Sequence, residues 1–588
     1  MNNTLSRCKY WEFVLFVTLL ATVVTAWFTR PLLSHFRTRI SGLHGDALEH
    51  LWTIWWFDQA LFTRGQLPSV LDVINYPAVL EHPILTAGFW MRTVSLPLVR
   101  CFGPVVAYNA HLFVSYVLNW LFMSLFCLEL TKNRAAAIIG GAIFTYFVNH
   151  TMHIFYGHWT IAMTYPLPLL ALMLWLVIKR PSFWKSVALG VLLVVSATID
   201  LPVLAHFTIP LVAAVLIFFL MSDRSQILSS PVLKHLGLSF GLAALILVPI
   251  MWPFLVSLFT GQLDWYGEGG VGTFSTDLLS PIIPPPGHIL TLIWPGLNML
   301  SDKIYSFDVS AAESVVYVGW PVAILASAGL YWGREKKQDV GMWFMLAAML
   351  SILALGPILR VAGEVITLNG RWVILPYFLL MKTPLFAWGR APARFYFAIM
   401  FGVSILAAYG AGYLLERLSS RRGVVAAAAV MLALILVDAK YFTEWPLLDV
   451  IDVPAFYDDL AKDPFAVAVL DVPVLDYDAA KYHMLYQMTH GHTLVGGYNY
   501  RLRPDVVQTL TRLEALTKPG GAPQQLAEIG VGYIVLHHRF LSPEELDETA
   551  HYLTNEIGEP IYQDDQITAF LVPGALEIAP LPLVSGQH

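Results

Sequence analysis

Long apolar runs recur along the first three quarters of the chain, separated by short polar connections. A helix needs about 20 apolar residues to cross the hydrocarbon core of a bilayer, and most of these runs approach that length. About eleven such runs can be placed, near residues 11–28, 104–130, 135–149, 162–178, 186–199, 201–220, 236–258, 314–332, 341–359, 394–414 and 423–439. The pattern predicts a polytopic α-helical membrane protein with about 11 transmembrane helices.

Basic residues occupy every second connection between the apolar runs. They are Arg7 and Lys9; Lys132 and Arg134; Lys179, Arg180 and Lys185; Arg224 and Lys234; Arg334, Lys336 and Lys337; and Arg417, Arg421 and Arg422. Cytoplasmic connections carry an excess of Lys and Arg, so we assign these segments and the N-terminus to the cytoplasm. The N-terminal run resembles a signal peptide, but no small-residue cleavage site follows it, so we interpret it as a retained first span.

The remaining connections lie on the outer side and include three long loops, at residues 29–103, 259–312 and 360–393. An odd number of spans also places the chain after residue 440 outside. Charged and turn residues increase there, and short β-type runs appear at 465–470 and 531–536. We therefore predict a multi-pass transmembrane domain over residues 1–440 and an extracytoplasmic α/β domain over residues 441–588.

The composition agrees with a membrane protein. Of the 588 residues, 57% are hydrophobic and 13% are charged, with a mean hydropathy of +0.62. The net charge of -6 gives no reason to expect a nucleic-acid partner. The three cysteines, Cys8, Cys101 and Cys127, have no metal-ligand spacing, and the chain contains neither a Gly-x-Ser-x-Gly nor a His-Glu-x-x-His motif. Disulfide frameworks, zinc sites of that kind and the corresponding hydrolases are therefore not supported.

A charged stretch follows the first apolar run closely. Asp46, Glu49 and His50 recur at three- and four-residue steps, so they share one face of a helix. Three tryptophans mark a second face, suited to the headgroup zone of a membrane: Trp52, Trp55 and Trp56. An interfacial helix would hold the carboxylates where a lipid headgroup lies. Asp46 followed three residues later by Glu49 is also a capping-box pattern. Asp46 could cap the helix and still act as a catalytic base.

Two further outer connections carry candidate polar groups. His150, His153 and His158 lie within nine residues, but their spacing matches no strong metal motif, which favours histidines that only form hydrogen bonds. His158 is kept as a substrate contact because it lies between a glycine and a tryptophan in a short loop. Asp200 closes an apolar run on the same side, where it either caps a helix hairpin or contributes to a site.

Arg390 and Arg394 flank Pro392, a residue suited to the first turn of a helix. The tenth span would then begin near Pro392 with its N-terminus pointing outward. Free N–H groups, the positive end of the helix dipole and two guanidiniums would converge there, which is typical of a phosphate site. Arginines that extend to anionic lipid headgroups are the alternative.

These motifs resemble those of the C-superfamily membrane glycosyltransferases (GT-C fold), and of a poorly characterised bacterial branch in particular. That branch pairs a Gly-Asp-x-x-x-x-x-Trp first loop, here Gly45 to Trp52, with an Arg-x-Pro-x-Arg-Phe helix start, here Arg390 to Phe395. The resemblance implies an enzyme of the bacterial inner membrane. It would transfer a sugar from a polyprenyl-phosphate-linked donor to a glycan, lipid or protein acceptor on the extracytoplasmic face, with inversion at the anomeric carbon.

By this resemblance, Asp46 would be the general base, and Arg390 and Arg394 would stabilise charge on the leaving lipid phosphate. Many relatives have a second acid in the next outer loop, where this chain has histidines instead. Asp200 and Glu268 are candidates for the missing carboxylate. The dependence on a divalent cation therefore stays open.

Two other functions remain as alternatives. A transporter or flippase of lipid-linked sugars would need polar residues within the spans, and Asn109, His111 and Asn119 meet that requirement in one of them. A non-catalytic envelope assembly protein would use the outer α/β domain to bind a partner. Because most polar candidates gather at the outer ends of the spans, the sequence favours an enzyme.

Overall fold

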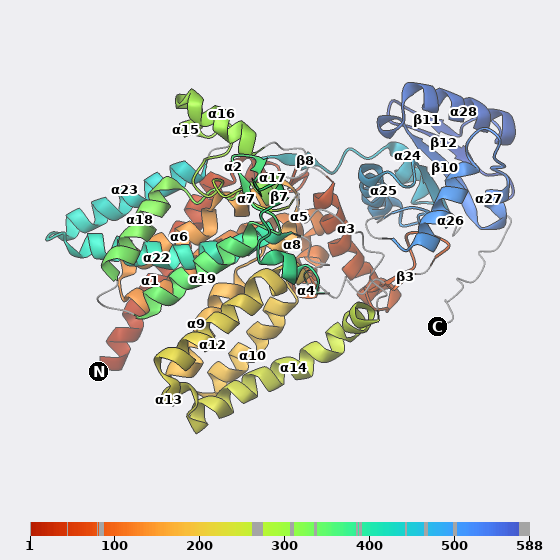
Figure 1. Cartoon of the computed structure of the whole chain (residues 1–588). Helices are drawn as coiled ribbons and strands as arrows, with labels where there is room; N and C mark the ends of the chain where they lie inside the picture. Colours follow the sequence, from red (N-terminus) through yellow and green to blue (C-terminus); the bar gives the residue numbers. More distant parts are fainter. Residues whose placement is uncertain are drawn as a thin grey trace.

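Apolar helices make up most of the molecule (Figure 1). The computed structural model describes residues 2–43, 45–78, 80–81, 88–260, 274–305, 311–333, 338–383, 386, 391–440, 444–463, 468–497 and 502–575. Two predicted site residues, Glu268 and Arg390, lie outside these ranges.

Seven helical segments of the described chain are long and apolar enough to cross a membrane. They are Tyr10–Phe28, Pro104–Thr131, Arg134–Phe155, Leu201–Ser222, Ser230–Ser257, Pro392–Glu416 and Arg421–Ala439. The other predicted spans coincide with shorter apolar helices: Pro166–Lys179, Phe183–Ala197, Trp320–Trp332 and Asp339–Ala354. The helical membrane part is thus confirmed, whereas the number of eleven spans stays a prediction.

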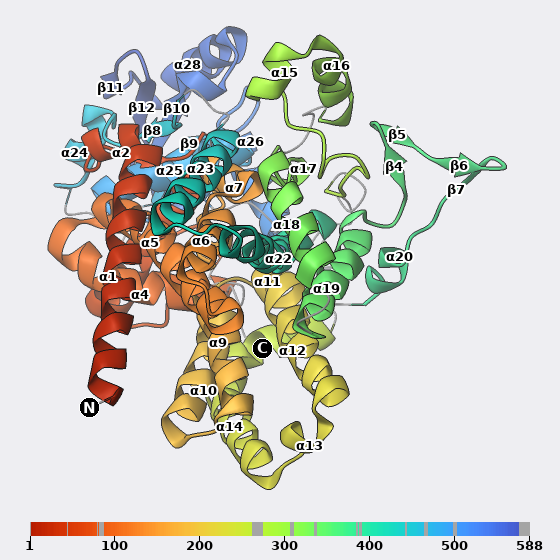
Figure 2. The ribbon, with the colours of Figure 1, turned by 90° about the vertical axis from the view of Figure 1, so that its left-hand side faces the viewer.

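The main helices follow the predicted apolar runs. They are α1 (Asn2–Phe28), α5 (Pro104–Thr131), α6 (Arg134–Tyr146), α7 (Val148–Phe155), α9 (Pro166–Lys179), α10 (Phe183–Ala197), α12 (Ile209–Ser222), α14 (Ser230–Phe259), α18 (Trp320–Trp332), α19 (Gln338–Ala354), α22 (Tyr396–Glu416) and α23 (Arg421–Ala439). Figure 2 shows α18 and α19 beside α22, which is buried along most of its length.

Small residues allow α18 and α22 to pack backbone against backbone. A Cβ atom on Gly329 would lie 1.9 Å from the carbonyl oxygen of Leu406, and one on Gly410 would lie 1.9 Å from that of Leu325. Apolar side chains gain little by leaving lipid, so helices in a membrane associate through such close contacts. These two glycines therefore fix the distance between the two helices.

Short elements connect the spans on the side where the functional candidates lie. They include α2 (Arg30–Ser34), β1 (Arg39–Ser41), α3 (Asp46–Asp58), β2 (Val70–Leu71), β3 (Leu80–Glu81), α4 (Phe89–Phe102), α8 (Trp159–Ala162), α11 (Leu201–Val203), α15 (Ile289–Ile293), α16 (Pro295–Ile304) and α17 (Ala311–Ser314). The later ones are the hairpins β4 (Arg360–Val361) with β5 (Glu364–Val365) and β6 (Thr367–Leu368) with β7 (Arg371–Trp372), then α20 (Tyr377–Leu380) and the 3-10 turn η5 (Pro392–Phe395).

The chain from 455 to 571 folds around a four-stranded sheet, and we call it the C-terminal α/β region. Its strands are β9 (Ala468–Val472), β10 (Val531–His537), β11 (Tyr562–Gln563) and β12 (Ile567–Leu571), in the order β11-β12-β10-β9. The β9–β10 pair is parallel and the other pairs are antiparallel. Its helices are α24 (Ala455–Leu460), α25 (Tyr477–His490), α26 (Pro504–Ala515), α27 (Gln525–Glu528) and α28 (Pro543–Ile557).

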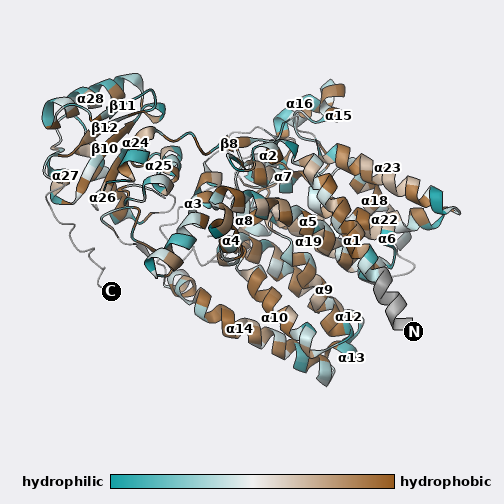
Figure 3. Ribbon diagram, turned by 180° about the vertical axis from the view of Figure 1, so that it is seen from behind, coloured by the Kyte–Doolittle hydropathy of each residue, from teal (hydrophilic) through white to brown (hydrophobic). Residues whose placement is uncertain are grey.

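Every residue of β9 and β10 is buried, as the apolar runs at 465–470 and 531–536 suggest. Figure 3 shows the apolar helices at one end of the molecule and the more polar C-terminal α/β region at the other. The boundary at residue 440 stays a prediction.

The first outer loop is tied to the C-terminal α/β region. Strand β1 pairs with β8 (Leu447–Asp449), and the backbone N–H groups of Asn75 and Tyr76 donate to the carbonyls of Gly496 and Leu494, at 2.8 and 3.0 Å. In both pairings the partners are about four hundred positions apart in the chain. Nothing local in either segment indicates this pairing.

The expected position of the tryptophans in the headgroup zone is wrong. Trp52 and Trp56 are 1% and 0% exposed, and their rings stack with centroids 5.8 Å apart. The indole N–H of Trp52 donates to Gln487 on α25 at 2.8 Å, and that of Trp56 donates to the carbonyl of Pro68 at 2.9 Å. The face of α3 that looked suited to lipid packs against protein instead, with α25 at Trp52 and the loop segment of Pro68 at Trp56.

Gln487→Leu tests this interface. The fully buried Gln487 amide accepts from Trp52 and donates to the carbonyls of Val73 and His492, at 2.7 and 3.0 Å. Leucine leaves these groups unpaired, at a cost of about 1–3 kcal/mol for each buried group. We expect a clearly lower midpoint of thermal unfolding for the detergent-purified protein.

The control is Gln524→Leu, because the Gln524 amide makes its hydrogen bonds to Glu556 at the exposed surface. It should leave the midpoint nearly unchanged. Equal midpoints for the two variants would contradict the importance of the buried amide.

Candidate functional site

Asp46 is the first residue of α3, and its carboxylate faces away from the helix backbone. The N-cap is Gly45, with no capping hydrogen bond from a side chain. The carbonyl of Gly45 accepts the N–H groups of Leu48 and Glu49, at 2.9 and 3.2 Å. The capping-box interpretation of Asp46 is therefore wrong in this structure, and the carboxylate is available for other contacts.

The Asp46 carboxylate contacts three side chains from two distant segments. Lys481 Nζ lies 2.5 Å from Oδ1, the Tyr477 hydroxyl donates to Oδ1 at 3.0 Å, and His158 Nε2 lies 3.4 Å from Oδ2. Tyr477 and Lys481 belong to α25, and the Lys481 ammonium also lies 3.5 Å from the centroid of the Tyr477 ring. The C-terminal α/β region therefore supplies part of the site.

These contacts decide the protonation of Asp46. Burial alone would raise the pKa of the carboxyl, but the hydrogen bond with His158 and the charge of Lys481 more than offset it. The pKa of Asp46 is held well below its usual range. The carboxylate is ionised at neutral pH, and it is a weak base as long as Lys481 stays bound to it.

Two glycines allow the close approach of these segments. A Cβ atom on Gly45 would lie 2.3 Å from Cδ of Lys481. Gly157 has a φ of +76°, and a Cβ atom there would lie 2.4 Å from the backbone nitrogen of Ala47. The glycine before Asp46 and the glycine before His158 are thus required by packing around the carboxylate.

A second histidine continues the contacts beyond His158. His153, on α7, is fully buried, and its Nδ1 lies 2.8 Å from Nδ1 of His158. If neutral His158 donates from Nε2 to Asp46, its Nδ1 must accept, so His153 carries its proton on Nδ1. His153 Nε2 then presents a lone pair 3.9 Å from Oε2 of Glu313. Neither of these two atoms has a hydrogen-bond partner among the described residues.

Glu313 and Arg394 complete the row. The Glu313 carboxylate is 2% exposed, and its Oε1 accepts from Nε and Nη2 of Arg394 at 2.8 and 2.6 Å. Asn149 on α7 binds the carbonyls of Ala312 and Val315, at 2.7 and 2.9 Å, and so holds α17 in place. Arg394 lies in the turn η5, which starts at Pro392 as the sequence predicts.

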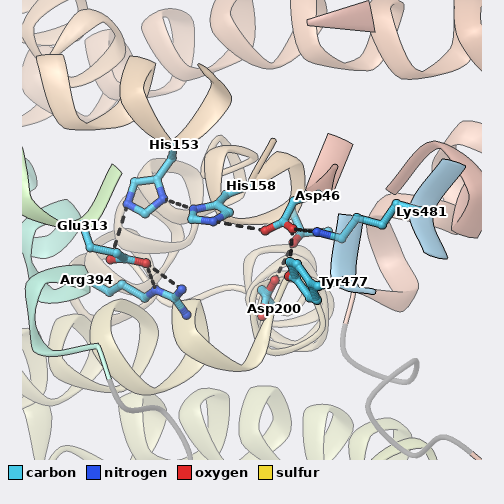
Figure 4. Close-up of polar contacts among 9 residues, drawn as sticks. Asp46, His153, His158, Asp200, Glu313, Arg394, Tyr477 and Lys481 are labelled. Atoms are coloured by element: carbon cyan, nitrogen blue, oxygen red, sulfur yellow. Dashed lines mark hydrogen bonds and ion pairs between the residues drawn. The ribbon is translucent and has the colours of Figure 1, made fainter. Parts of the chain in front are cut away.

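Together these side chains form what we call the polar chain, shown in Figure 4. Its members, in spatial order, are Lys481, Asp46, His158, His153, Glu313 and Arg394. They come from five segments that are far apart in the sequence. The chain is mostly buried, but the side chains of Asp46, His158 and Arg394 remain 30%, 16% and 20% exposed, so both ends can be reached from outside.

Asp200 lies beside the polar chain. It is the N-cap residue of α11 and accepts a short hydrogen bond from the hydroxyl of Thr160, which follows His158 by two residues. Figure 4 places its carboxylate on the side of Asp46 and Tyr477. The predicted grouping of Asp200 with Asp46 and His158 is thus consistent with the structure, whereas its role stays a prediction.

Glu49 and His50 lie next to Asp46 on α3, outside the polar chain. Burial, together with the nearby charge of Asp46, raises the pKa of Glu49 to about 8, so this carboxyl is mostly protonated at neutral pH. Burial lowers the pKa of His50 to about 3, and its ring packs 6.2 Å from that of Trp159. His50 is therefore neutral and held by packing.

Sequence reasoning missed four members of the site: His153 as a contact, Glu313, Tyr477 and Lys481. Glu313 could have been found, because an acid directly before a predicted span is the same signal that singled out Asp200. Lys481 gives no such signal, since it lies on α25, 435 positions after its partner. Only the folding of α25 onto α3 makes it part of the site.

The middle of the polar chain fits a divalent cation. His153, His158 and Glu313 each offer one ligand atom, and these atoms lie within 4.8 Å of one another. Two imidazoles and one carboxylate are a common ligand set for Zn²⁺. The unpartnered His153 Nε2 and Glu313 Oε2 face each other, and two such acceptors repel unless a proton or a cation lies between them.

The family model described as "Domain of unknown function (DUF6311)" matches residues 102–440. The chain belongs to this family. The matched segment contains His153, His158, Glu313 and Arg394, whereas Asp46 and Lys481 lie outside it. No curated protein matches the sequence.

Solved structures show the fold. The arabinofuranosyltransferase AftD from Mycobacteria superposes on 95% of this chain with a TM-score of 0.56 at 11% identity. The match covers 40% of AftD, so this chain spans about two fifths of its length. The chain therefore has a helical, GT-C-like membrane fold, which confirms the predicted fold class in this coarser form; the eleven spans, the extracytoplasmic position of the C-terminal part and the bacterial branch stay predictions.

Two further solved structures match with lower scores. The oligosaccharyltransferase AglB from Archaeoglobus fulgidus, solved with an inhibitory peptide and a dolichol-phosphate, matches with a TM-score of 0.49 at 13% identity, over 90% of this chain and 69% of AglB. ArnT from Cupriavidus metallidurans, solved with undecaprenyl phosphate, matches with a TM-score of 0.47 at 12% identity, over 98% and 99% of the two chains.

The Glu313–Arg394 pair can be tested by a double-mutant cycle with Glu313→Gln, Arg394→Met and the double variant. Each single change leaves a buried partner uncompensated, so each should lower the free energy of unfolding. The double variant should be less destabilised than the sum of the two, with a coupling of about 0.5–3 kcal/mol. Thermal unfolding of the purified variants measures this coupling.

The matched control is the Lys462–Asp459 pair, whose side chains are 73% and 77% exposed at a distance of 2.8 Å. Exposed pairs couple by about 0.2–1 kcal/mol. A Glu313–Arg394 coupling no larger than that of this control would contradict a buried ion pair.

Proposed function

We propose that the protein is a membrane glycosyltransferase that moves a sugar from a polyprenyl-phosphate-linked donor to an acceptor at the extracytoplasmic face. The observation that carries this proposal is the polar chain, which joins a carboxylate, Asp46, to a guanidinium, Arg394, at the ends of apolar helices. The fold shared with AftD supports the same reaction class. The acceptor is a glycan, a lipid or a protein.

In this reaction an acceptor hydroxyl attacks the anomeric carbon of the donor. The new glycosidic bond forms as the bond from that carbon to the phosphate oxygen breaks, so the configuration inverts in a single displacement. Asp46 takes the proton of the attacking hydroxyl. The bond electrons leave with the lipid phosphate, where added positive charge lowers the barrier.

The contact with Lys481 sets a condition on this role of Asp46. A carboxylate with a strongly lowered pKa accepts a proton poorly, so Lys481 must move away, or be replaced by the acceptor, before transfer. Asp46 is therefore held ionised by Lys481 in the resting state. When the acceptor binds and the Lys481 ammonium moves away, the Asp46 carboxylate becomes more basic.

Arg394 is the candidate for the phosphate contact. Glu313 binds its Nε and Nη2 groups, which fixes the plane of the guanidinium and leaves other N–H donors for phosphate oxygens. The pair with Glu313 has no net charge, so Arg390, which lies outside the described residues, remains part of the proposed phosphate site. The residues proposed to line the substrate-binding site are Glu49, His50, His158, Asp200 and Glu268.

A divalent cation, if the enzyme uses one, would be held by His153, His158 and Glu313. When bound there, it would supply positive charge near the phosphate. His158 would still lie between that position and Asp46, and Arg394 would still be oriented by Glu313. His158 and Arg394 therefore have the same proposed roles with or without a bound cation.

We place the protein in the bacterial inner membrane, with its N-terminus in the cytoplasm and the C-terminal α/β region outside. The alternation of basic connections supports this orientation, and the polar chain lies at the end of the bundle where the C-terminal α/β region is attached.

The three polar residues that support the transporter alternative make hydrogen bonds within the fold. Asn109 donates to the carbonyls of Phe36 and Arg39, at 3.0 and 2.7 Å, and both ring nitrogens of His111 contact neighbouring hydroxyls. Asn119 accepts from Thr164 at 3.2 Å. Each of these three polar residues of α5 thus makes hydrogen bonds inside the fold, whereas Asn109 Oδ1 and Asn119 Nδ2 have no partner among the described residues.

Asp46→Asn tests the proposed base. Because asparagine cannot take the acceptor proton, transfer from a polyprenyl-phosphate sugar should fall by about 10²–10⁴-fold. Asp72→Asn, which changes an acid of the same outer loop that contacts Arg64 and Gln66, should retain activity. Unchanged turnover in Asp46→Asn, measured with a radiolabelled or fluorescent donor, would refute the assignment.

Lys481→Met tests the electrostatic role of the ammonium through the pH profile of kcat/KM. Loss of the positive charge raises the pKa of Asp46, so the carboxylate is ionised only at higher pH and the acidic limb of the profile moves upward. Lys481→Arg keeps the charge and should hold the limb near its wild-type position. A rate loss that is equal at every pH would instead indicate a purely structural role.

A further inference from the structure

A second polar cluster lies inside the C-terminal α/β region, away from the polar chain. Asp471 on β9, His483 on α25 and His537 at the end of β10 are 3%, 1% and 2% exposed. One ligand atom from each lies within 4.8 Å of the others. The proposed glycosyl transfer makes no use of this cluster.

The topology of the sheet brings these residues together. Strands β9 and β10 run parallel, with Asp471 opposite Val535, so Asp471 and His537 both lie near the carboxyl ends of their strands. The helix that follows β9 passes over these ends and places His483 on them, with ring centroids of His483 and His537 4.4 Å apart. The carboxyl ends of parallel strands are where such folds bind ligands.

The hydrogen bonds of the cluster are incomplete. Asp471 Oδ1 lies 2.8 Å from His537 Nε2 and accepts from the Tyr457 hydroxyl at 2.7 Å. Its other oxygen, Oδ2, and both ring nitrogens of His483 have no hydrogen-bond partner among the described residues. A buried polar atom without a partner costs free energy, and an unpaired carboxylate oxygen in the same cluster as an unpaired imidazole points to a ligand there.

The chemistry of the donors identifies the class of ligand. Two imidazoles and a carboxylate bind Zn²⁺, with Zn–N and Zn–O distances of about 2.0–2.2 Å. Ligand atoms of one ion are therefore up to about 4 Å apart, and the three candidate atoms already lie within 4.8 Å of one another. We propose that Asp471, His483 and His537 bind one Zn²⁺ ion.

The surroundings resemble those of a protected metal site. The Tyr457 hydroxyl orients the carboxylate from the outside, as hydrogen-bond donors around metal ligands commonly do. The Tyr457 ring stacks on those of Tyr486 and His490, with centroids 4.9 and 5.3 Å away, and Tyr486 also stacks on His537 at 5.6 Å. These rings limit the access of bulk water to the ion.

The ion would join α25 to the sheet. His483 follows Lys481 by two residues, and the same helix carries Tyr477. A metal that fixes His483 against β9 and β10 thus also fixes the two side chains that contact Asp46. The proposal concerns metal binding and does not depend on the proposed glycosyl transfer.

The experiment measures the metal content of the full-length protein. The detergent-purified protein is stripped with a chelator, incubated with ZnSO₄, desalted and analysed by mass spectrometry for bound zinc, with a parallel measurement of the thermal midpoint. We expect about one equivalent held at the cluster and a midpoint that rises with zinc concentration, because an ion that binds the folded state stabilises it.

Single variants test which residues bind this zinc ion. His483→Ala should lose it and weaken zinc binding by more than about 100-fold, a larger effect than the loss of an outer hydrogen-bond partner. His551→Ala, at an exposed histidine of the same region, should retain it. His153→Ala should also retain it, which separates this cluster from the histidines of the polar chain.

Two results would overturn the proposal. One is a wild-type protein that neither retains zinc nor gains thermal stability when zinc is added, a measurement that needs no variant to fold. The other is zinc that is lost in His153→Ala and retained in His483→Ala, which would place the ion in the polar chain.

Discussion

The ion pair between Asp46 and Lys481 joins the two parts of the molecule. It connects the first outer loop to a helix of the C-terminal α/β region, with the ammonium 2.5 Å from the carboxylate and 5% exposed. A charge at such a place is stable only when it is paired, because burial removes its hydration. The glycine at position 45, the buried indole of Trp52 and the amide of Gln487 all serve this same contact between α3 and α25.

The polar chain extends this principle into the membrane part. Each charged member has a partner of opposite sign or a hydrogen bond, and the two histidines connect the acidic groups at Asp46 and Glu313. The one incomplete link lies between His153 and Glu313, and it is also where the ligand set for a cation is found. A positive charge between the His153 imidazole and the Glu313 carboxylate would therefore both stabilise the fold and be placed where a cation could act.

The membrane helices and the buried strands could be predicted from local patterns. Apolar runs of sufficient length must be helical in a bilayer, where every backbone group needs an internal hydrogen bond, and each predicted run overlaps at least one helix. Asp46, His158, Asp200 and Arg394 could be selected because polar residues beside such runs are costly without a purpose. The tryptophans of α3 were misjudged, since an amphipathic face does not reveal whether lipid or protein covers it.

The sequence by itself determined the helical class and pointed to the polar residues beside the apolar runs. The tertiary structure alone decided that Lys481 and Tyr477 meet Asp46, and that Glu313 binds Arg394. The physical reason is the range of the interactions. Helix formation depends on neighbours within a few positions, whereas a site made of charges depends on contacts across hundreds of positions, which only packing brings together. The stretch from Gly45 to Trp52 contains both kinds of information: its helix is local, and its chemistry is not.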